Sequence, residues 1–164
     1  MKCVTLQNGG HMNIFVLDKD PQIAAQMQCD KHVVKMVLES AQMLCTVVRV
    51  LGIEAPYKAT HKNHPCTIWA RQTQQNWDWL VEHALALCKE YTKRYGKVHK
   101  SQQHIEWCQS LSIKLPDFGL TPFAQAMPEQ YKNPCVVSAY RAYYMGEKSK
   151  FATWRTKSPH WWTN

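Results

Sequence analysis

The most regular hydrophobic pattern in the chain runs from residue 29 to residue 45, with the sequence CDKHVVKMVLESAQMLC. Read at 3.6 residues per turn, its apolar positions fall on one broad helix face, formed by Val33, Val34, Val37, Leu38, Ala41, Leu44 and Cys45. Beside that face, His32, Lys35 and Glu39 occupy successive turns. The segment therefore predicts a core helix with a polar stripe along its edge.

Other segments show the same helical period and are separated by polar or proline-containing stretches. Asp20 with Pro21 and, further on, Asp30 are helix-start signals, and Gly96 is a helix-end signal. Thr73 is able to recap the longest helix, which would bend it near that residue. In chain order, the predicted elements are an extended segment over 12–17, a short helix over 20–28, the core helix over 30–51, a polar loop over 56–65, a long helix over 67–95, a helix over 101–111, a loop over 115–128, a helix over 134–145 and a tail.

These elements predict a compact all-α fold in a single domain, with at most one short N-terminal strand and an irregular aromatic C-terminal tail. A length of 164 residues with 45% apolar content is enough for one hydrophobic core. Residues 1–11 show no periodicity and contain a glycine pair near their end. We interpret them as an extension or leader that precedes a helical domain over 12–164.

The cysteine content bears on the compartment. The chain has seven cysteines, mostly among apolar neighbours, and no C-x-x-C pair. This usage favours reduced, buried thiols and an intracellular, cytoplasmic protein. No apolar run approaches the roughly 20 residues that a membrane span needs, and we find no signal-peptide pattern at the N-terminus. We therefore expect a protein without a membrane partner.

The charge of the chain is strongly positive. It has 20 Lys and Arg residues against 12 Asp and Glu residues, for a net charge of +8. The excess is concentrated over residues 57–100 and 140–157, where aromatic residues are interleaved with the cations. This pattern is typical of a surface that binds a phosphate backbone. A basic protein with no nucleic-acid role is the alternative.

The polar stripe beside the core helix is the first candidate for chemistry. His32, Lys35 and Glu39 provide a base, an amine and a carboxylate, which can carry out proton transfer or Schiff-base chemistry. The alternative is an ordinary helix edge, in which Lys35 and Glu39 form a half-exposed ion pair next to a surface histidine. The stripe alone leaves both interpretations open.

The loop THKNHP is the second candidate. It places His61, Asn63 and His64 directly before a predicted helix N-terminus, where free backbone N–H groups and the helix dipole favour anions. The alternative is that Asn63 and His64 only cap that helix. These histidines with His32 and Asp30 are also conceivable metal ligands, but their spacing matches no known motif. We expect no metal and no cofactor.

Taken in order, these segments resemble the pyrimidine-dimer DNA glycosylase family, small all-helical repair enzymes of phages and bacteria that are also called endonuclease V-type UV repair proteins. The resemblance lies in the start MNIFVL, the helix VKMVLESAQML with a glutamate at its buried edge, the turn YKATHKNHP and the basic helix end LCKEYTKRYG. It covers about residues 12–95. The motifs DKHVVKM and HKNHP are more similar still to uncharacterised phage proteins.

The resemblance implies a mechanism. Glu39 matches the family's essential glutamate, which helps to protonate the sugar and drives β-elimination. The family's nucleophile is the amine at the mature N-terminus, which attacks the sugar C1′ and forms a Schiff base. Here that nucleophile would be the amine of Met12, or of Asn13 if the methionine is removed. A neutral α-amine is available near about pH 8, whereas an ordinary lysine is still protonated there.

The chain departs from the family pattern at its start. With residues 1–11 attached, Met12 carries no free amine, and Lys35 or Lys31 becomes the substitute nucleophile if burial lowers its pKa. Asn13 is also an unusual second residue, because methionine is usually retained before asparagine.

We therefore expect a DNA-acting enzyme, most simply a DNA glycosylase with abasic-site lyase activity that acts as a monomer on duplex or single-stranded DNA, in phage or bacterial cytosol. The alternatives are a transferase or hydrolase that modifies a DNA base or nucleotide, and a non-catalytic nucleic-acid-binding protein. The candidate catalytic residues are Glu39, His32, Lys35, His61, His64 and Met12. The candidate DNA contacts are Lys31, Lys62, Asn63, Arg71, Lys93, Arg94, Lys97, Lys100, Arg141, Trp154 and Arg155.

Overall fold

A computed structural model of the chain describes residues 12–163. Within this range the chain forms six α-helices and one short 3₁₀ helix, and it contains no β-strand. The elements are α2 (Pro21–Met27), α3 (Asp30–Val50), α4 (Pro65–Gln72), α5 (Gln74–Tyr95), α6 (Gln102–Ser110), η1 (Glu129–Tyr131) and α7 (Val136–Glu147). The predicted all-α class is confirmed. The extension expected over residues 1–11 lies outside the described residues.

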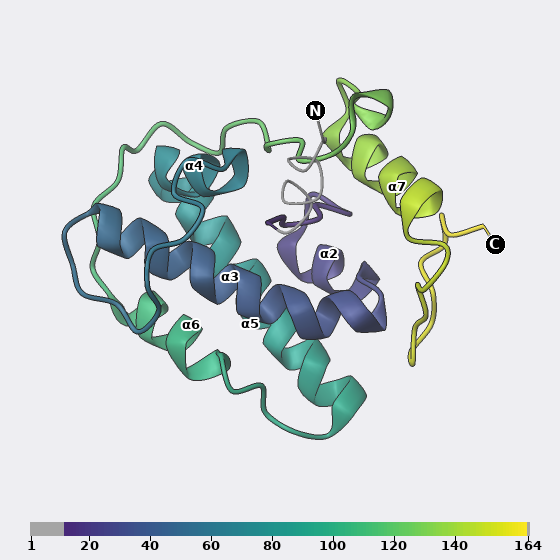
Figure 1. The fold of residues 1–164 in the computed structure, drawn as a ribbon, viewed down its shortest axis with the longest axis horizontal. Helices are drawn as coiled ribbons and strands as arrows, with labels where there is room; N and C mark the ends of the chain where they lie inside the picture. The colour runs from purple at the N-terminus through teal and green to yellow at the C-terminus, as the bar shows by residue number, and fades with distance from the viewer. Residues whose placement is uncertain (1–11, 164) are drawn as a thin grey trace, which may run out of the picture.

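Helices α3 and α5 pack against each other at the centre of the molecule (Figure 1). Helix α2 packs on α5, whereas α4 and α6 each contact both central helices. Figure 1 shows α7 and the C-terminal tail on the side of the molecule that lies away from α6. None of the helices within residues 12–163 combines the length and the apolar character that a membrane crossing requires.

The apolar face predicted for α3 is buried along its middle, where Val33, Val37 and Leu44 are fully enclosed. Val34 and Leu38 instead lie at the rim of that face, with 38% and 37% of their surface exposed. The buried face is therefore narrower than the pattern predicted. The segment predicted as one long helix also buries one side, formed by Trp69, Trp77, Leu80, Ala84, Leu87, Cys88 and Tyr91.

Local polar signals set several helix ends. Asp20 caps α2 as predicted, with its Oδ1 accepting a hydrogen bond from the backbone N–H of Gln22 at 2.8 Å. Thr73 separates α4 from α5, because its Oγ1 accepts from the backbone N–H of Asn76 at 3.1 Å and so starts a new helix. Gly96 ends α5 with a φ of +71°, a left-handed conformation that glycine adopts without strain.

Asp30 is not the N-cap of α3, and this prediction was wrong. Cys29 occupies the cap position and makes no side-chain capping bond, while Asp30 is the first residue of the helix. The carboxylate of Asp30 instead accepts from the guanidinium of Arg94 at 3.1 Å and from the backbone N–H of Arg155 at 3.0 Å. Both partners are distant in the sequence, so no local pattern indicates them.

Residues 12–17 are buried, but they form a kinked turn instead of the predicted extended segment. The Oδ1 of Asn13 accepts from the backbone N–H of Phe15 at 3.0 Å, and the backbone N–H of Leu17 donates to the carbonyl of Phe15 at 2.9 Å. Phe15 accordingly has a φ of +57°. An asparagine side chain that bonds to its own backbone competes with extended structure, and here it kinks the chain beside α3.

Candidate active site

Glu39 lies in the middle of α3 and is almost completely buried, with 4% of its surface exposed. Its Oε1 accepts a hydrogen bond from the backbone N–H of Asn13 at 3.2 Å. Its Oε2 has no hydrogen-bond partner among the described residues and lies 3.6 Å from the Nζ of Lys35. Burial raises the pKa of Glu39 to about 7, although Lys35 and the Asn13 N–H oppose this shift. Near neutral pH the group is therefore able both to donate and to accept a proton.

The backbone that meets Glu39 is held in place from two sides. The side-chain Nδ2 of Asn13 donates to the carbonyl of Ala126 at 2.8 Å, which ties the turn to the loop before η1. Met12 is buried beside it. The backbone nitrogen of Asn13 therefore has a defined position next to the carboxylate.

Lys35 forms the open side of this site. Its side chain is 46% exposed, whereas that of Glu39 is 6% exposed. The ion pair considered in the sequence interpretation exists, but it is not an ordinary surface pair, because desolvation of its carboxylate partner dominates the pKa of that group.

His32 is buried two turns before Glu39 and is not the surface histidine of the alternative interpretation. Its Nδ1 shares a hydrogen bond of 2.5 Å with the hydroxyl of Tyr144, and its ring stacks on Phe15 with the ring centres 4.4 Å apart. Burial, together with three neighbouring lysines, lowers the pKa of His32 to about 3. His32 is therefore neutral at physiological pH, and it packs against Phe15 of the turn over residues 12–17 (the Asn13 turn).

The loop before α4 is attached to α3. The backbone N–H of Thr60 donates to the Oγ1 of Thr46 at 3.0 Å. His64 is the N-cap of α4, because its Nδ1 accepts from the backbone N–H of Cys66 at 3.1 Å, which confirms the capping alternative for this residue. His61 is exposed on the loop with a φ of +49°.

The first turn of α4 lies near Glu39. Burial raises the pKa of the Cys66 thiol to about 12, and the charge of the Glu39 carboxylate contributes to this shift. The structure thus brings Glu39, the Asn13 turn, Lys35 and the start of α4 into one region. It gives no contact that joins the exposed His61 side chain to the Glu39 carboxylate within residues 12–163.

The predicted histidines and Glu39 lie away from the groove between α2, α5 and α6. A groove with a volume of about 870 Å³ lies between α2, α5 and α6, and none of His32, Glu39, His61 and His64 lines it. Within residues 12–163 there is also no group of three or more His, Cys, Asp or Glu side chains able to hold a metal ion. The structure therefore does not support the metal-site alternative that joined these histidines to Asp30.

The candidate DNA contacts differ in their exposure. Those exposed to solvent are Lys31, Lys62, Asn63, Lys93, Lys97, Lys100 and Arg155. Arg155 also lies over the ring of Tyr95, with its guanidinium carbon 4.2 Å from the ring centre. The half-buried ones are bonded within the protein: Arg71 to the Lys62 carbonyl at 2.7 Å, Arg141 to the Leu17 carbonyl at 2.9 Å and Trp154 to the Met27 carbonyl at 2.9 Å.

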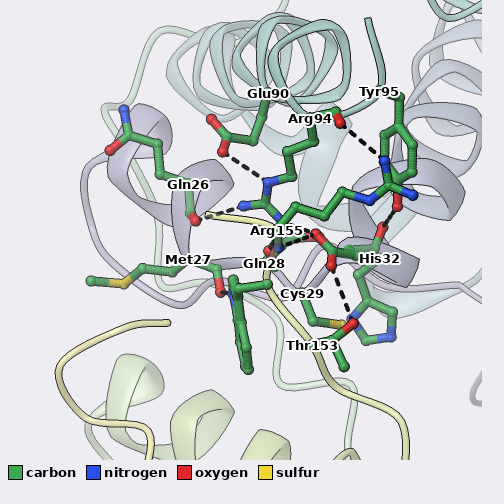
Figure 2. Close-up of polar contacts among 12 residues, drawn as sticks. Gln26, Met27, Gln28, Cys29, His32, Glu90, Arg94, Tyr95, Thr153 and Arg155 are labelled. Atoms are coloured by element: carbon green, nitrogen blue, oxygen red, sulfur yellow. Dashed lines mark hydrogen bonds and ion pairs between the residues drawn. The ribbon is translucent and has the colours of Figure 1, made fainter. Parts of the chain in front are cut away.

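Arg94 is not a DNA contact, and the structure corrects this prediction. Its side chain is completely buried and forms ion pairs with Asp30 at 3.1 Å and with Glu90 at 2.9 Å. Figure 2 shows its guanidinium enclosed between α5, the end of α2 and the C-terminal tail around Thr153. A cationic residue at a helix end either faces solvent or is buried in the interior. The sequence does not distinguish these two environments, because they depend on tertiary packing.

Lys148 is a residue that the sequence interpretation missed. It follows α7 directly, is half-buried, and its Nζ lies 4.8 Å from the centre of the Tyr143 ring and 5.6 Å from that of Phe15. Its only signal in the sequence was its place in the basic stretch over 140–157. Helical spacing relates residues within one helix, so it could not place Lys148 near α3.

Comparison with known proteins gives a family match. A family model described as pyrimidine dimer DNA glycosylase matches residues 12–113, which is more than half of the chain. The match begins at Met12 and contains Glu39, Lys35 and the loop before α4. Neither the search of curated proteins nor the search of solved structures gives a match. The extent of the family match, together with the all-helical fold, shows that this chain belongs to the pyrimidine dimer DNA glycosylase family.

Proposed function

We propose that this protein is a DNA glycosylase with abasic-site lyase activity that acts on pyrimidine dimers in duplex DNA. One observation carries the proposal: the Oε1 of Glu39 lies 3.2 Å from the backbone nitrogen of Asn13. That nitrogen is the α-amine of a chain that starts at Asn13, and the α-amine of a chain that starts at Met12 is one residue away. The start of the family match at residue 12 supports a functional start at this point.

The chemistry begins with attack of the neutral α-amine on C1′ of the damaged nucleotide. The N–C1′ bond forms while the glycosidic bond breaks, and the base leaves with the electron pair of that bond and takes up the proton that the attacking amine loses. The nitrogen lone pair then opens the sugar ring to give a protonated imine between the amine and C1′, and the protonated carboxyl group of Glu39 supplies the proton for the ring oxygen. In the second stage the Glu39 carboxylate takes a proton from C2′, the C3′–O bond breaks, and the 3′ phosphate leaves.

The titration properties of the two groups suit these steps. An α-amine has a pKa of about 8, so a useful fraction is neutral near physiological pH. The pKa of Glu39 is raised to about 7 by burial, so both of its protonation states are populated in the same range. A group with these properties acts as an acid in one stage and as a base in the next.

The surrounding residues have supporting roles in this proposal. His64 caps the start of α4, and Cys66 in the first turn of this helix lies near Glu39. The N-terminus of a helix favours a developing negative charge or a phosphate. His61 and Lys62, on the same exposed loop, contact the sugar–phosphate chain. The exposed lysines Lys93, Lys97 and Lys100 at the end of α5 hold the DNA backbone farther away.

Borohydride trapping on UV-irradiated duplex DNA tests the nucleophile. A chain that begins at Met12 is expected to form a stable covalent adduct with DNA when borohydride reduces the imine. The matched comparison is the full 164-residue chain, in which the nitrogen of Met12 is an amide and cannot attack C1′. We expect at least about tenfold less adduct from the full chain. Equal trapping by both chains would contradict the assignment and favour a lysine, with Lys35 or Lys31 as the first candidates.

Strand cleavage tests the glutamate. The variant Glu39→Gln is expected to lose roughly 100-fold or more of the cleavage rate, which is the usual size of a general acid–base contribution. Glu106→Gln, which changes an exposed glutamate on α6, is the matched control and should cleave at the original rate. Unchanged cleavage by Glu39→Gln, or no trapping by the chain that begins at Met12, would reject the lyase mechanism.

A further inference from the structure

Three lysines from two distant parts of the chain gather around His32. Lys31 and Lys35 are one turn apart on α3, and Lys148 follows α7. All three ammonium groups act on the same imidazole, since each of them contributes to the low pKa of His32 after the effect of burial. Burial lowers the pKa of Lys148, and repulsion by the charge of Lys35 adds to this effect. Like charges have therefore been placed close together.

Aromatic rings hold two of these lysines. The Nζ of Lys148 lies over the rings of Tyr143 and Phe15, and 3.5 Å from the Tyr143 hydroxyl. The Nζ of Lys31 lies 4.8 Å from the centre of the Phe151 ring, and that of Lys148 lies 6.0 Å from the same ring. Aromatic faces orient an ammonium group without neutralising it. The cluster thus keeps its positive charge available to a ligand.

The carboxylates nearby do not balance this charge. Within residues 12–163, neither Lys31 nor Lys148 forms a salt bridge. Lys35 has one partner, Glu39 at 3.6 Å, and that carboxyl group is protonated in a large part of the molecules near neutral pH because its pKa is about 7. Glu147 acts on Lys148 through its charge, but it is exposed to solvent. The cluster therefore has a surplus of positive charge, and one of its members, Lys35, lies directly beside the Glu39 carboxyl group.

We propose that Lys31, Lys35 and Lys148 together bind one phosphodiester group of DNA next to Glu39. This inference rests on the proposed function, and it identifies the contact that places the damaged sugar at the Asn13 turn. A phosphodiester fits because it offers a compact anion to three point-like cations that approach from two directions. Lys148 lies outside the matched region 12–113, so the C-terminal part of the chain supplies one third of this site.

The salt dependence of DNA binding tests the site without any need for catalysis. Fluorescence anisotropy of the full chain with a labelled, undamaged duplex gives the slope of log Kd against log salt concentration. Each lost lysine–phosphate contact lowers the magnitude of this slope by about one unit. We expect this decrease for Lys148→Met and also for Lys31→Met. We expect the original slope for Lys148→Arg, because arginine keeps the charge.

Lys150→Met is the matched control, because it removes an exposed lysine two residues away and changes the net charge equally. Its slope should stay within about half a unit of the original. Equal slopes for Lys148→Met and Lys150→Met would overturn the proposal, as would a Lys148→Arg variant that loses as much as Lys148→Met. Thermal unfolding checks that Lys148→Met is folded, and Lys31→Met repeats the test from α3 if it is not.

The two proposals fail in different ways. If the slope decreases as expected but trapping and cleavage fail, the phosphate site stands and the enzymatic proposal falls. If trapping succeeds while the slope is unaffected by Lys148→Met and Lys31→Met, the glycosylase stands and the three-lysine site is refuted.

Discussion

Replacing Glu39 with glutamine is expected to stabilise the protein at alkaline pH while it removes activity. Burial raises the pKa of Glu39 from an ordinary value of 4.5 to about 7 in the folded protein. The difference between these two values is 2.5 units, and each unit corresponds to about 1.36 kcal/mol. The ionised carboxylate therefore costs the folded state about 3 kcal/mol, a cost that the neutral amide of glutamine does not have.

The sign of the effect follows from which state binds the proton more tightly. Below a pH of 4.5, Glu39 is protonated in both states and its titration costs nothing. Between 4.5 and about 7 the unfolded chain releases the proton while the folded protein keeps it, so stability falls as the pH rises. Above about 7 the folded protein is ionised as well, and the full cost is present.

Urea unfolding of the two proteins at several pH values measures this cost. The free energy of unfolding of Glu39→Gln minus that of the original protein should increase by about 3 kcal/mol between about pH 4 and about pH 8.5. All other titrating groups are common to both proteins, so their effects largely cancel in the difference. A constant offset from altered hydrogen bonding to Asn13 does not affect the result, because the readout is the change with pH.

A difference that stays flat with pH would refute this reasoning, because it would mean that Glu39 titrates normally and is not desolvated. A difference that decreases with pH would mean that its ion pair with Lys35 outweighs its burial. Either result would also remove the argument that Glu39 acts as both acid and base near neutral pH.

Three further predictions concern interactions that stabilise the helices. Arg94→Ala should lower the free energy of unfolding by about 3–5 kcal/mol, because it leaves two buried carboxylates without their partner, while the exposed Lys93→Ala should change it by less than about 0.5 kcal/mol; similar urea midpoints for both would contradict the buried network. Thr73→Ala should cost about 1 kcal/mol through loss of the α5 cap, whereas Thr92→Ala on the exposed side of α5 should not, and equal costs would argue against the cap. Gly96→Ala should cost about 1 kcal/mol in the same assay, since alanine is strained at a φ of +71°, and a neutral result would argue against the left-handed helix end.

The sequence predicted the parts of this fold that depend on neighbouring residues. The period of α3 and α5, the cap at Asp20, the break at Thr73 and the helix end at Gly96 are interactions within a few residues. They can be predicted because a helix repeats every 3.6 residues and its caps bond to the adjacent turn. The resemblance to the glycosylase family over residues 12–95 can be found for the same reason, because the motifs that carry it are continuous stretches of sequence.

Glu39 shows where local information ends. Its place on the helix edge could be predicted, but its contact with the backbone of Asn13 and its near-complete burial depend on a turn twenty-six residues earlier. Asp30 and Arg94 were misassigned in the same way, because each carries a charge that suits a helix terminus or a surface and is instead used in the interior. The sequence shows which residues carry charge, but it does not show which of them are buried or which partners they contact.

Tertiary packing alone decided which charges are desolvated and which meet. It buried Arg94 and left Lys93 exposed on the same helix. It also placed Lys148, which follows α7, over the ring of Phe15 in the turn beside α3. The physical reason is that burial and electrostatic coupling depend on distances between segments far apart in the chain, and helical periodicity contains no information about those distances.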